Sequence, residues 1–240
     1  MNKTTTDLGH RETGTGLKIV GGFSRRRFLG FAGILAGAGF VTLTSCNRDD
    51  DDTPGPTDDG VNLGSGDTGV LNYAYALEQL EAAFYTQVIA SRYAGMSADE
   101  EALLRDIRDH EIAHREFFKA ALGGSAIPDL EVDFSSINFT SRQSVLETAR
   151  TFEDLGVQAY NGAGKLLTDP KNLTMAGKIV SVEARHAAYI RNLLQPGSFA
   201  DTSILDPATR TDISKTPTQV LAAADDFIVT KINASALPND

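Results

Sequence analysis

The tetrapeptides Glu111-Ile112-Ala113-His114 and Glu183-Ala184-Arg185-His186 decide the fold, because each lies near the middle of a long stretch with helical periodicity. Three helical residues turn the chain through about 300°, so the Glu and the His of each tetrapeptide lie on one face of a helix, within reach of one metal ion. One such tetrapeptide would carry little information, since acidic residues and histidines often share a helix face. The question is whether other helices supply ligands at the same depth.

Four stretches of the chain carry apolar residues at steps of three and four, which is typical of amphipathic helices. We expect the first from Leu71 to about Tyr93 and the second from a cap at Ser97 to a stop at Gly123. The third should begin at a cap at Thr140 and end before the break at Asp169-Pro170, and the fourth should follow that break and end before Pro196. A short fifth helix is expected on the outside of the bundle, from a capping box at Thr216 to about Phe227.

The connections between these stretches set the topology. Short turns join the first helix to the second and the third to the fourth, so the members of each pair should be antiparallel neighbours. The connection between the second and third helices has about 17 residues, which can span more than the roughly 30 Å of a 20-residue helix. The sequence therefore predicts an all-α four-helix bundle with one long crossover between helices 2 and 3.

The Glu and the His of each tetrapeptide stand in the apolar stripe of their helix. The third helix adds Glu153, which lies in line with Ala149, Val157 and Tyr160. A buried carboxylate is costly unless it is paired or bound to a metal, so Glu153 requires a partner.

The first helix offers Glu78 or Glu81 as a further carboxylate. A helical wheel favours Glu81, which falls inside the apolar arc, whereas Glu78 falls at its edge. The internal repeat favours Glu78, because Glu78 precedes Tyr85 by seven residues as Glu153 precedes Tyr160. Both residues stay as alternatives.

One Glu from each of two helices and one Glu-x-x-His from each of the other two make the ligand set of a dinuclear carboxylate site. Oxygen and imidazole ligands without a thiolate favour iron or manganese over structural zinc. We expect two iron or manganese ions, no haem, and open positions for dioxygen or peroxide. The alternative is a metal-free bundle with buried Glu–His and Glu–Arg hydrogen bonds, which would leave several acids uncompensated in one core layer.

Three other side chains lie near this layer. Tyr85 and Tyr160 have three interpretations: hydrogen-bond donors to the carboxylates, redox-active phenols, or core aromatics with satisfied hydroxyls. His110, four residues before His114, would suit a two-His ion site, but its position off the main stripe beside Asp109 predicts a surface histidine.

Residues 1–45 have the features of an export leader. Arg25 and Arg26 precede an apolar run rich in Gly and Ala and resemble a twin-arginine signal. Leu43-Thr44-Ser45-Cys46 resembles a lipobox in which Cys46 is lipidated; the alternative is a cleaved leader without lipid. We expect export by the twin-arginine route and attachment to a membrane of the cell envelope through a lipid anchor, on the periplasmic or surface side.

The remainder of the chain divides into three parts. Residues 46–69, rich in Asp, Gly, Pro and Thr, should form an acidic flexible tether; residues 70–228 hold the folded domain and residues 229–240 a tail. The leader holds 6 Lys+Arg and 2 Asp+Glu of the 22 and 32 in the chain, so the rest carries a net charge near −14. This charge argues against nucleic acid as a partner.

Over about residues 70–227 the chain resembles the bacterial exported ferritin-like domain proteins, which are similar to the plant desiccation-related proteins. The resemblance rests on residues 71–74 and 77–85, on 110–114, on 153–160, on 183–186 and on the closing Thr216-Pro217-Thr218-Gln219-Val220-Leu221. It implies a ferritin-like bundle. For the wider superfamily it implies oxidation of ferrous iron, peroxide reduction or catalase-like manganese chemistry.

We therefore expect an exported protein with a dinuclear iron or manganese site that handles oxidants or ferrous iron at the cell envelope, as in a stress response. The alternative is a non-catalytic stress-protective or binding protein on the same scaffold. The expected partners are metal ions, dioxygen or peroxide, and a membrane; the native metal, the reaction and the oligomeric state stay open.

Overall fold

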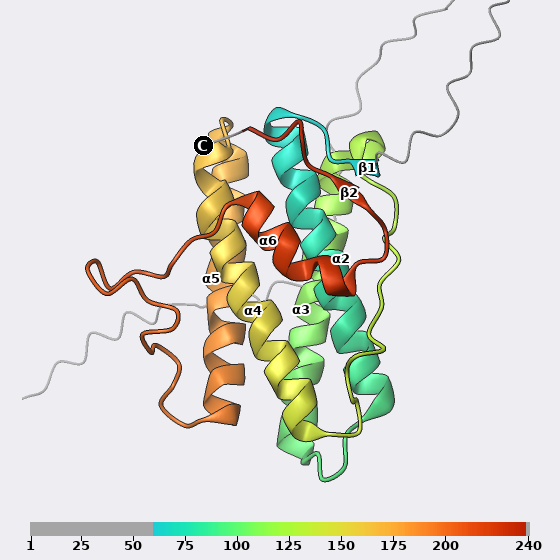
Figure 1. The fold of residues 1–240 in the computed structure, drawn as a ribbon, viewed down its shortest axis with the longest axis vertical. Helices are drawn as coiled ribbons and strands as arrows, with labels where there is room; N and C mark the ends of the chain where they lie inside the picture. The colour runs from blue at the N-terminus through green and yellow to red at the C-terminus, as the bar shows by residue number, and fades with distance from the viewer. Residues whose placement is uncertain (1–59, 239–240) are drawn as a thin grey trace, which may run out of the picture. The chain divides into compact units, whose positions relative to one another are not determined.

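Four long helices packed side by side form the body of the protein, in a computed structural model that describes residues 60–238 (Figure 1). They are α2 (Gly66–Ser91), α3 (Ala98–Leu122), α4 (Arg142–Ala163) and α5 (Pro170–Leu194). α2 packs mainly against α3, and α4 mainly against α5. The predicted all-α bundle is confirmed. Over residues 60–238, none of the helices combines the length and the apolar character that a bilayer crossing requires.

Side-chain caps fix where the helices begin. Ser97 caps α3 as predicted. The cap of α4 lies one residue later than predicted: Ser141, and not Thr140, accepts a hydrogen bond from the backbone N–H of Ser144. The Thr140 hydroxyl instead donates a hydrogen bond to the Asn138 side chain at 2.7 Å, within the turn that precedes the helix.

The start of α5 is tied to the start of α2. Asp169 caps α5 and Pro170 occupies the first helical turn. The Asp67 carboxylate of α2 accepts hydrogen bonds from the backbone N–H groups of Thr168 at 2.8 Å and Asp169 at 3.0 Å, and from the Asn172 side chain at 2.8 Å. The first and last helices of the bundle are therefore held together at this end.

The chain between η1 (Gly123–Ser125) and α4 is the long crossover, and it runs along the bundle (Figure 1). Two buried amides of α2 hold it in place. Asn72 accepts a hydrogen bond from the Ile127 N–H at 3.0 Å, and Gln79 accepts one from the Leu130 N–H at 2.7 Å. These bonds satisfy crossover backbone groups that the bundle would otherwise leave unpaired.

The two ends of the described chain pair with each other, contrary to the prediction that residues 60–69 are tether and residues 229–238 are tail. β1 (Val61–Asn62) and β2 (Ile232–Asn233) form a two-stranded parallel sheet. Leu63, next to β1, is completely buried. A few apolar residues inside a polar stretch are thus sufficient to attach both segments to the folded domain.

The predicted fifth helix is α6 (Pro217–Ala224), followed by η3 (Asp225–Phe227). It lies against α4 and buries Val220 completely. The chain before it passes close to the end of α4 near η2 (Gly164–Leu166): a Cβ on Gly162 would lie 1.7 Å from the Lys215 carbonyl oxygen. Only a glycine permits this approach.

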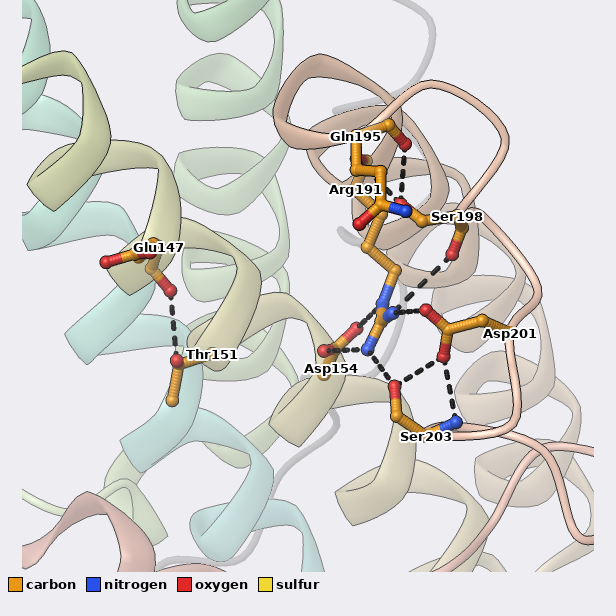
Figure 2. A network of polar contacts seen from close by, with 8 residues as sticks. All are labelled: Glu147, Thr151, Asp154, Arg191, Gln195, Ser198, Asp201 and Ser203. Atoms are coloured by element: carbon orange, nitrogen blue, oxygen red, sulfur yellow. Dashed lines mark hydrogen bonds and ion pairs between the residues drawn. The ribbon is translucent and has the colours of Figure 1, made fainter.

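A buried arginine attaches the segment between α5 and α6 to the bundle (Figure 2). Arg191 of α5 donates two hydrogen bonds, of 2.7 and 2.6 Å, to the Asp154 carboxylate of α4. It also donates to Asp201 at 3.1 Å and to the Ser203 hydroxyl at 3.0 Å. This network fixes the exposed segment beside the helix that carries Glu153.

Candidate metal centre

Six side chains from the four long helices converge in the middle of the bundle. They form two groups, and in each group one potential ligand atom per residue lies within 4.8 Å of all the others. Glu111 and Glu183 belong to both groups. The first group is completed by Glu78 and His114, the second by Glu153 and His186. Two carboxylates shared between two groups are the arrangement that bridging ligands of two ions require.

The converging atoms lie close together without forming hydrogen bonds to one another. His114 Nδ1 lies 2.8 Å from Glu183 Oε1, and His186 Nδ1 lies 2.7 Å from Glu111 Oε1. These contacts lack hydrogen-bond geometry, so within the described residues both Nδ1 atoms, both oxygens of Glu111 and Glu183, and one oxygen each of Glu78 and Glu153 are buried without a hydrogen-bond partner. Eight such atoms in one core layer would be costly in a metal-free protein. They fit a site that holds cations.

The four glutamates of the two groups are fully buried, and their pKa values are shifted from the usual range. Burial raises the pKa of Glu78 and of Glu153. Burial, and then the charge of Glu183, raise the pKa of Glu111 to about 8. Burial acts on Glu183 in the same direction, but the adjacent histidines outweigh it and lower its pKa. The centre therefore carries more acid than the core tolerates without positive charge.

The two histidines supply that positive charge when no ion is present. Burial disfavours a charged imidazole, but the close carboxylates of Glu111, Glu183 and Glu78 outweigh it and raise the pKa of His114 to about 12. The carboxylates around His186 also outweigh burial and raise its pKa. A divalent cation would take over this charge balance and release the protons.

The structure separates the two candidates on the first helix. Glu78 belongs to the first group, whereas Glu81 belongs to neither. Glu81 is buried and lies beside α4, where a Cβ on Gly156 would be 3.1 Å from its Oε1 atom. Burial, followed by the charges of the other carboxylates, raises its pKa well above the usual range. The internal repeat thus identified the converging residue. The helical wheel identified only a buried one.

Tyr85 and Tyr160 each donate a hydrogen bond to a glutamate on the opposite helix of the bundle. The Tyr85 hydroxyl of α2 donates to Glu153 of α4 at 2.5 Å, and the Tyr160 hydroxyl of α4 donates to Glu78 of α2. Burial, then the neighbouring carboxylates, raise the pKa of both phenols well above the usual range, so both are neutral donors. Of the three interpretations, the geometry agrees with hydrogen-bond donors that orient the two unshared glutamates.

His110 is exposed, as predicted, but it has a contact that the sequence did not predict. Its Nδ1 atom lies 2.9 Å from Nε2 of His186. The available signal was the spacing of four residues between His110 and His114, which places both on one side of α3. A helical wheel of α3 alone cannot show that this side faces His186 of α5.

A family model described as a ferritin-like domain matches residues 66–196, from the start of α2 to just beyond α5. The chain belongs to this family. No curated protein matches the chain. The match covers the four helices and both groups of converging residues, so fold and site lie within the same family domain.

Proposed function

We propose that the protein holds a dinuclear iron or manganese centre and handles oxidants or ferrous iron. The observation that carries this proposal is the set of two overlapping groups that share Glu111 and Glu183, with buried ligand atoms that lack other partners. Bound there, two redox ions would supply two-electron chemistry toward dioxygen, peroxide or ferrous iron.

The residues of the chain have distinct roles in this proposal. Glu111 and Glu183 would be shared by the two ions, because each belongs to both groups. Glu78 and Glu153 would each hold one ion, and the hydroxyls of Tyr160 and Tyr85, each from the opposite helix, orient these two carboxylates. The remaining ligand at each position is a histidine Nδ1 atom.

We also propose that the centre acts at the cell envelope. Support comes from the sequence alone: Arg25 and Arg26 of the expected export signal and Cys46 of the expected lipobox lie outside the described residues. The twin-arginine route carries folded proteins, which would allow the ions to be inserted before export.

Metal analysis of the full-length protein, expressed in iron- and manganese-replete medium, tests the proposal. We expect close to two ions per chain, and a loss of both in the double variant Glu111→Gln, Glu183→Gln. A matched control is Glu116→Gln, Glu147→Gln, which changes two exposed acids and should keep both ions. Less than one ion per chain, unchanged in the double variant, would contradict the centre.

Assays of ferrous oxidation and of peroxide consumption then separate an enzyme from a binding protein. We expect at least one rate to depend on the bound ions and to disappear in the double variant. Full metal content with neither activity would favour the alternative, a non-catalytic stress-protective or binding protein.

A further inference from the structure

His110 joins the solvent-facing side of α3 to a histidine of the candidate metal centre. Its Nδ1 atom lies 2.9 Å from Nε2 of His186, and the two rings are nearly parallel, with an interplanar angle of 15° and centroids 5.1 Å apart. Two imidazole nitrogens at this distance share one N–H···N hydrogen bond. One of the two nitrogens is therefore the donor and the other the acceptor.

The opposite edge of His186 decides which nitrogen is the donor. Its Nδ1 atom faces the carboxylates, at 2.7 Å from Glu111 Oε1 and 3.5 Å from Glu153 Oε2. A neutral imidazole that binds a cation through Nδ1 needs its lone pair there and its proton on Nε2. The Nε2–H group must then donate to an acceptor, and His110 Nδ1 is in the position to accept.

Helix α5 has no histidine at the position that corresponds to His110 of α3. The residue four positions before His186 is Val182, where α3 has His110 four positions before His114. An aliphatic side chain cannot accept a hydrogen bond. The two ligand histidines are thus equivalent in the internal repeat but differ in what supports them.

We propose that His110 is a positioning residue, which holds His186 in the tautomer and ring orientation that bind a cation through Nδ1. As a result, the ion position at Glu153 and His186 binds more tightly than the position at Glu78 and His114. This inference rests on the proposed metal centre. Partners that orient a ligand histidine typically change metal affinity 10–100-fold.

Titration of the metal-free full-length protein with Co²⁺, followed by visible absorption, tests the inference. We expect two binding events in the wild type. In His110→Ala the tighter event should weaken about 10–100-fold while the other stays within about twofold. His110→Asn should restore the tighter event, because its amide oxygen can accept the same hydrogen bond. Asp109→Ala, an exposed neighbour, is the control and should leave both events unchanged.

A second measurement reads the hydrogen bond directly. In the Zn²⁺-loaded protein, ¹⁵N NMR should show the His186 Nε2 proton, protected from solvent exchange in the wild type and in His110→Asn but exchanging rapidly in His110→Ala. Equal weakening of both binding events, or no weakening, with an unchanged Nε2 signal would overturn the role of His110. A wild-type protein that binds no Co²⁺ would instead contradict the metal centre itself, so the two failures are distinguishable.

Discussion

The helix pair α2/α3 and the helix pair α4/α5 carry the same set of site residues. Glu78, Tyr85, Glu111 and His114 of the first pair correspond to Glu153, Tyr160, Glu183 and His186 of the second. These repeated residues converge in the bundle, and each tyrosine donates to the glutamate of the other pair. The repetition explains why the centre has two similar halves.

Two of the differences between the pairs bear directly on the centre. Glu81 of α2 corresponds to Gly156 of α4, and the glutamate fills space next to the glycine. His110 of α3 corresponds to Val182 of α5, and only His110 can support a ligand histidine by a hydrogen bond. In the proposed centre the repeated residues would supply two ion positions, and the unrepeated residues beside them would make the two positions unequal.

The residue after each unshared glutamate has a related role in both pairs. Gln79 holds the crossover that follows α3, and Asp154, through Arg191, holds the segment that follows α5. The first pair uses a neutral amide and the second a buried ion pair. Equivalent positions in the two pairs thus attach the segment that follows each pair, one through amide hydrogen bonds and the other through an ion pair.

The largest expected effect is on the number of bound ions, which should fall further when a glutamate of both groups is changed than when a glutamate of one group is changed. Glu183→Gln should remove both ions, because Glu183 belongs to both groups, whereas Glu153→Gln should remove one and leave the Glu78 position occupied. Metal analysis by mass spectrometry after dialysis measures the difference. Equal losses in the two variants would contradict the assignment of bridging and terminal ligands.

The next largest effect is expected for the two contacts that attach connecting segments to the bundle, Arg191 with Asp154 and Gln79 with the crossover. Arg191→Ala leaves the Asp154 carboxylate without its bidentate partner and should lower the free energy of unfolding by about 3 kcal/mol. Gln79→Ala should cost about 1–2 kcal/mol, because it removes neutral hydrogen bonds. Urea unfolding measures both. Arg185→Ala, on the exposed side of α5, is the control, and its free energy of unfolding should stay within about 0.5 kcal/mol of wild type. An equal loss of stability in Arg191→Ala and Gln79→Ala would contradict the difference between the two attachments.

A smaller effect, with a definite pH dependence, is expected at Glu81. Its pKa is raised by burial, so the folded state holds the proton more tightly and stability falls as pH rises above the unfolded value of about 4.3. Glu81→Gln should therefore stabilise the metal-free protein at pH 7 by about 1–2 kcal/mol, and the gain should disappear near pH 4. Gly156→Ala should destabilise it, since the new Cβ would approach the Glu81 carboxylate at 3.1 Å. Thermal unfolding at several pH values tests both, and a gain independent of pH would contradict the account.

The smallest effect is expected at Asp67, which ties α2 to the start of α5. Backbone hydrogen bonds from Thr168, and then the Asn172 side chain, lower the pKa of Asp67. A lowered pKa gives stability above the unfolded value of about 3.9 that is lost as pH falls further. Asp67→Asn should cost about 0.5–1 kcal/mol at pH 7, because solvent screens this partly exposed carboxylate, and progressively less below pH 4. A cost that stayed constant down to pH 2 would show that the carboxylate charge is not involved.

Much of the fold and the centre could be predicted from the sequence, because both follow from local periodicity. Apolar stripes located the four helices, and loop lengths set the crossover. The internal repeat pointed to Glu78. The direction in which Glu81 extends, and the bond from His110 to His186, depend on how neighbouring helices are rotated against each other, which no single helix encodes. The pairing of β1 with β2 was missed because it joins the two ends of the domain through only a few residues.

The most direct test of the account is the location of the ions themselves. A crystal of the iron- or manganese-loaded protein, measured at the absorption edge of the metal, should show two anomalous peaks per chain. Both should be bound by Glu111 and Glu183, one with Glu78 and His114 and the other with Glu153 and His186. A single peak, or no peak among these six residues in a protein shown to contain metal, would contradict a dinuclear centre.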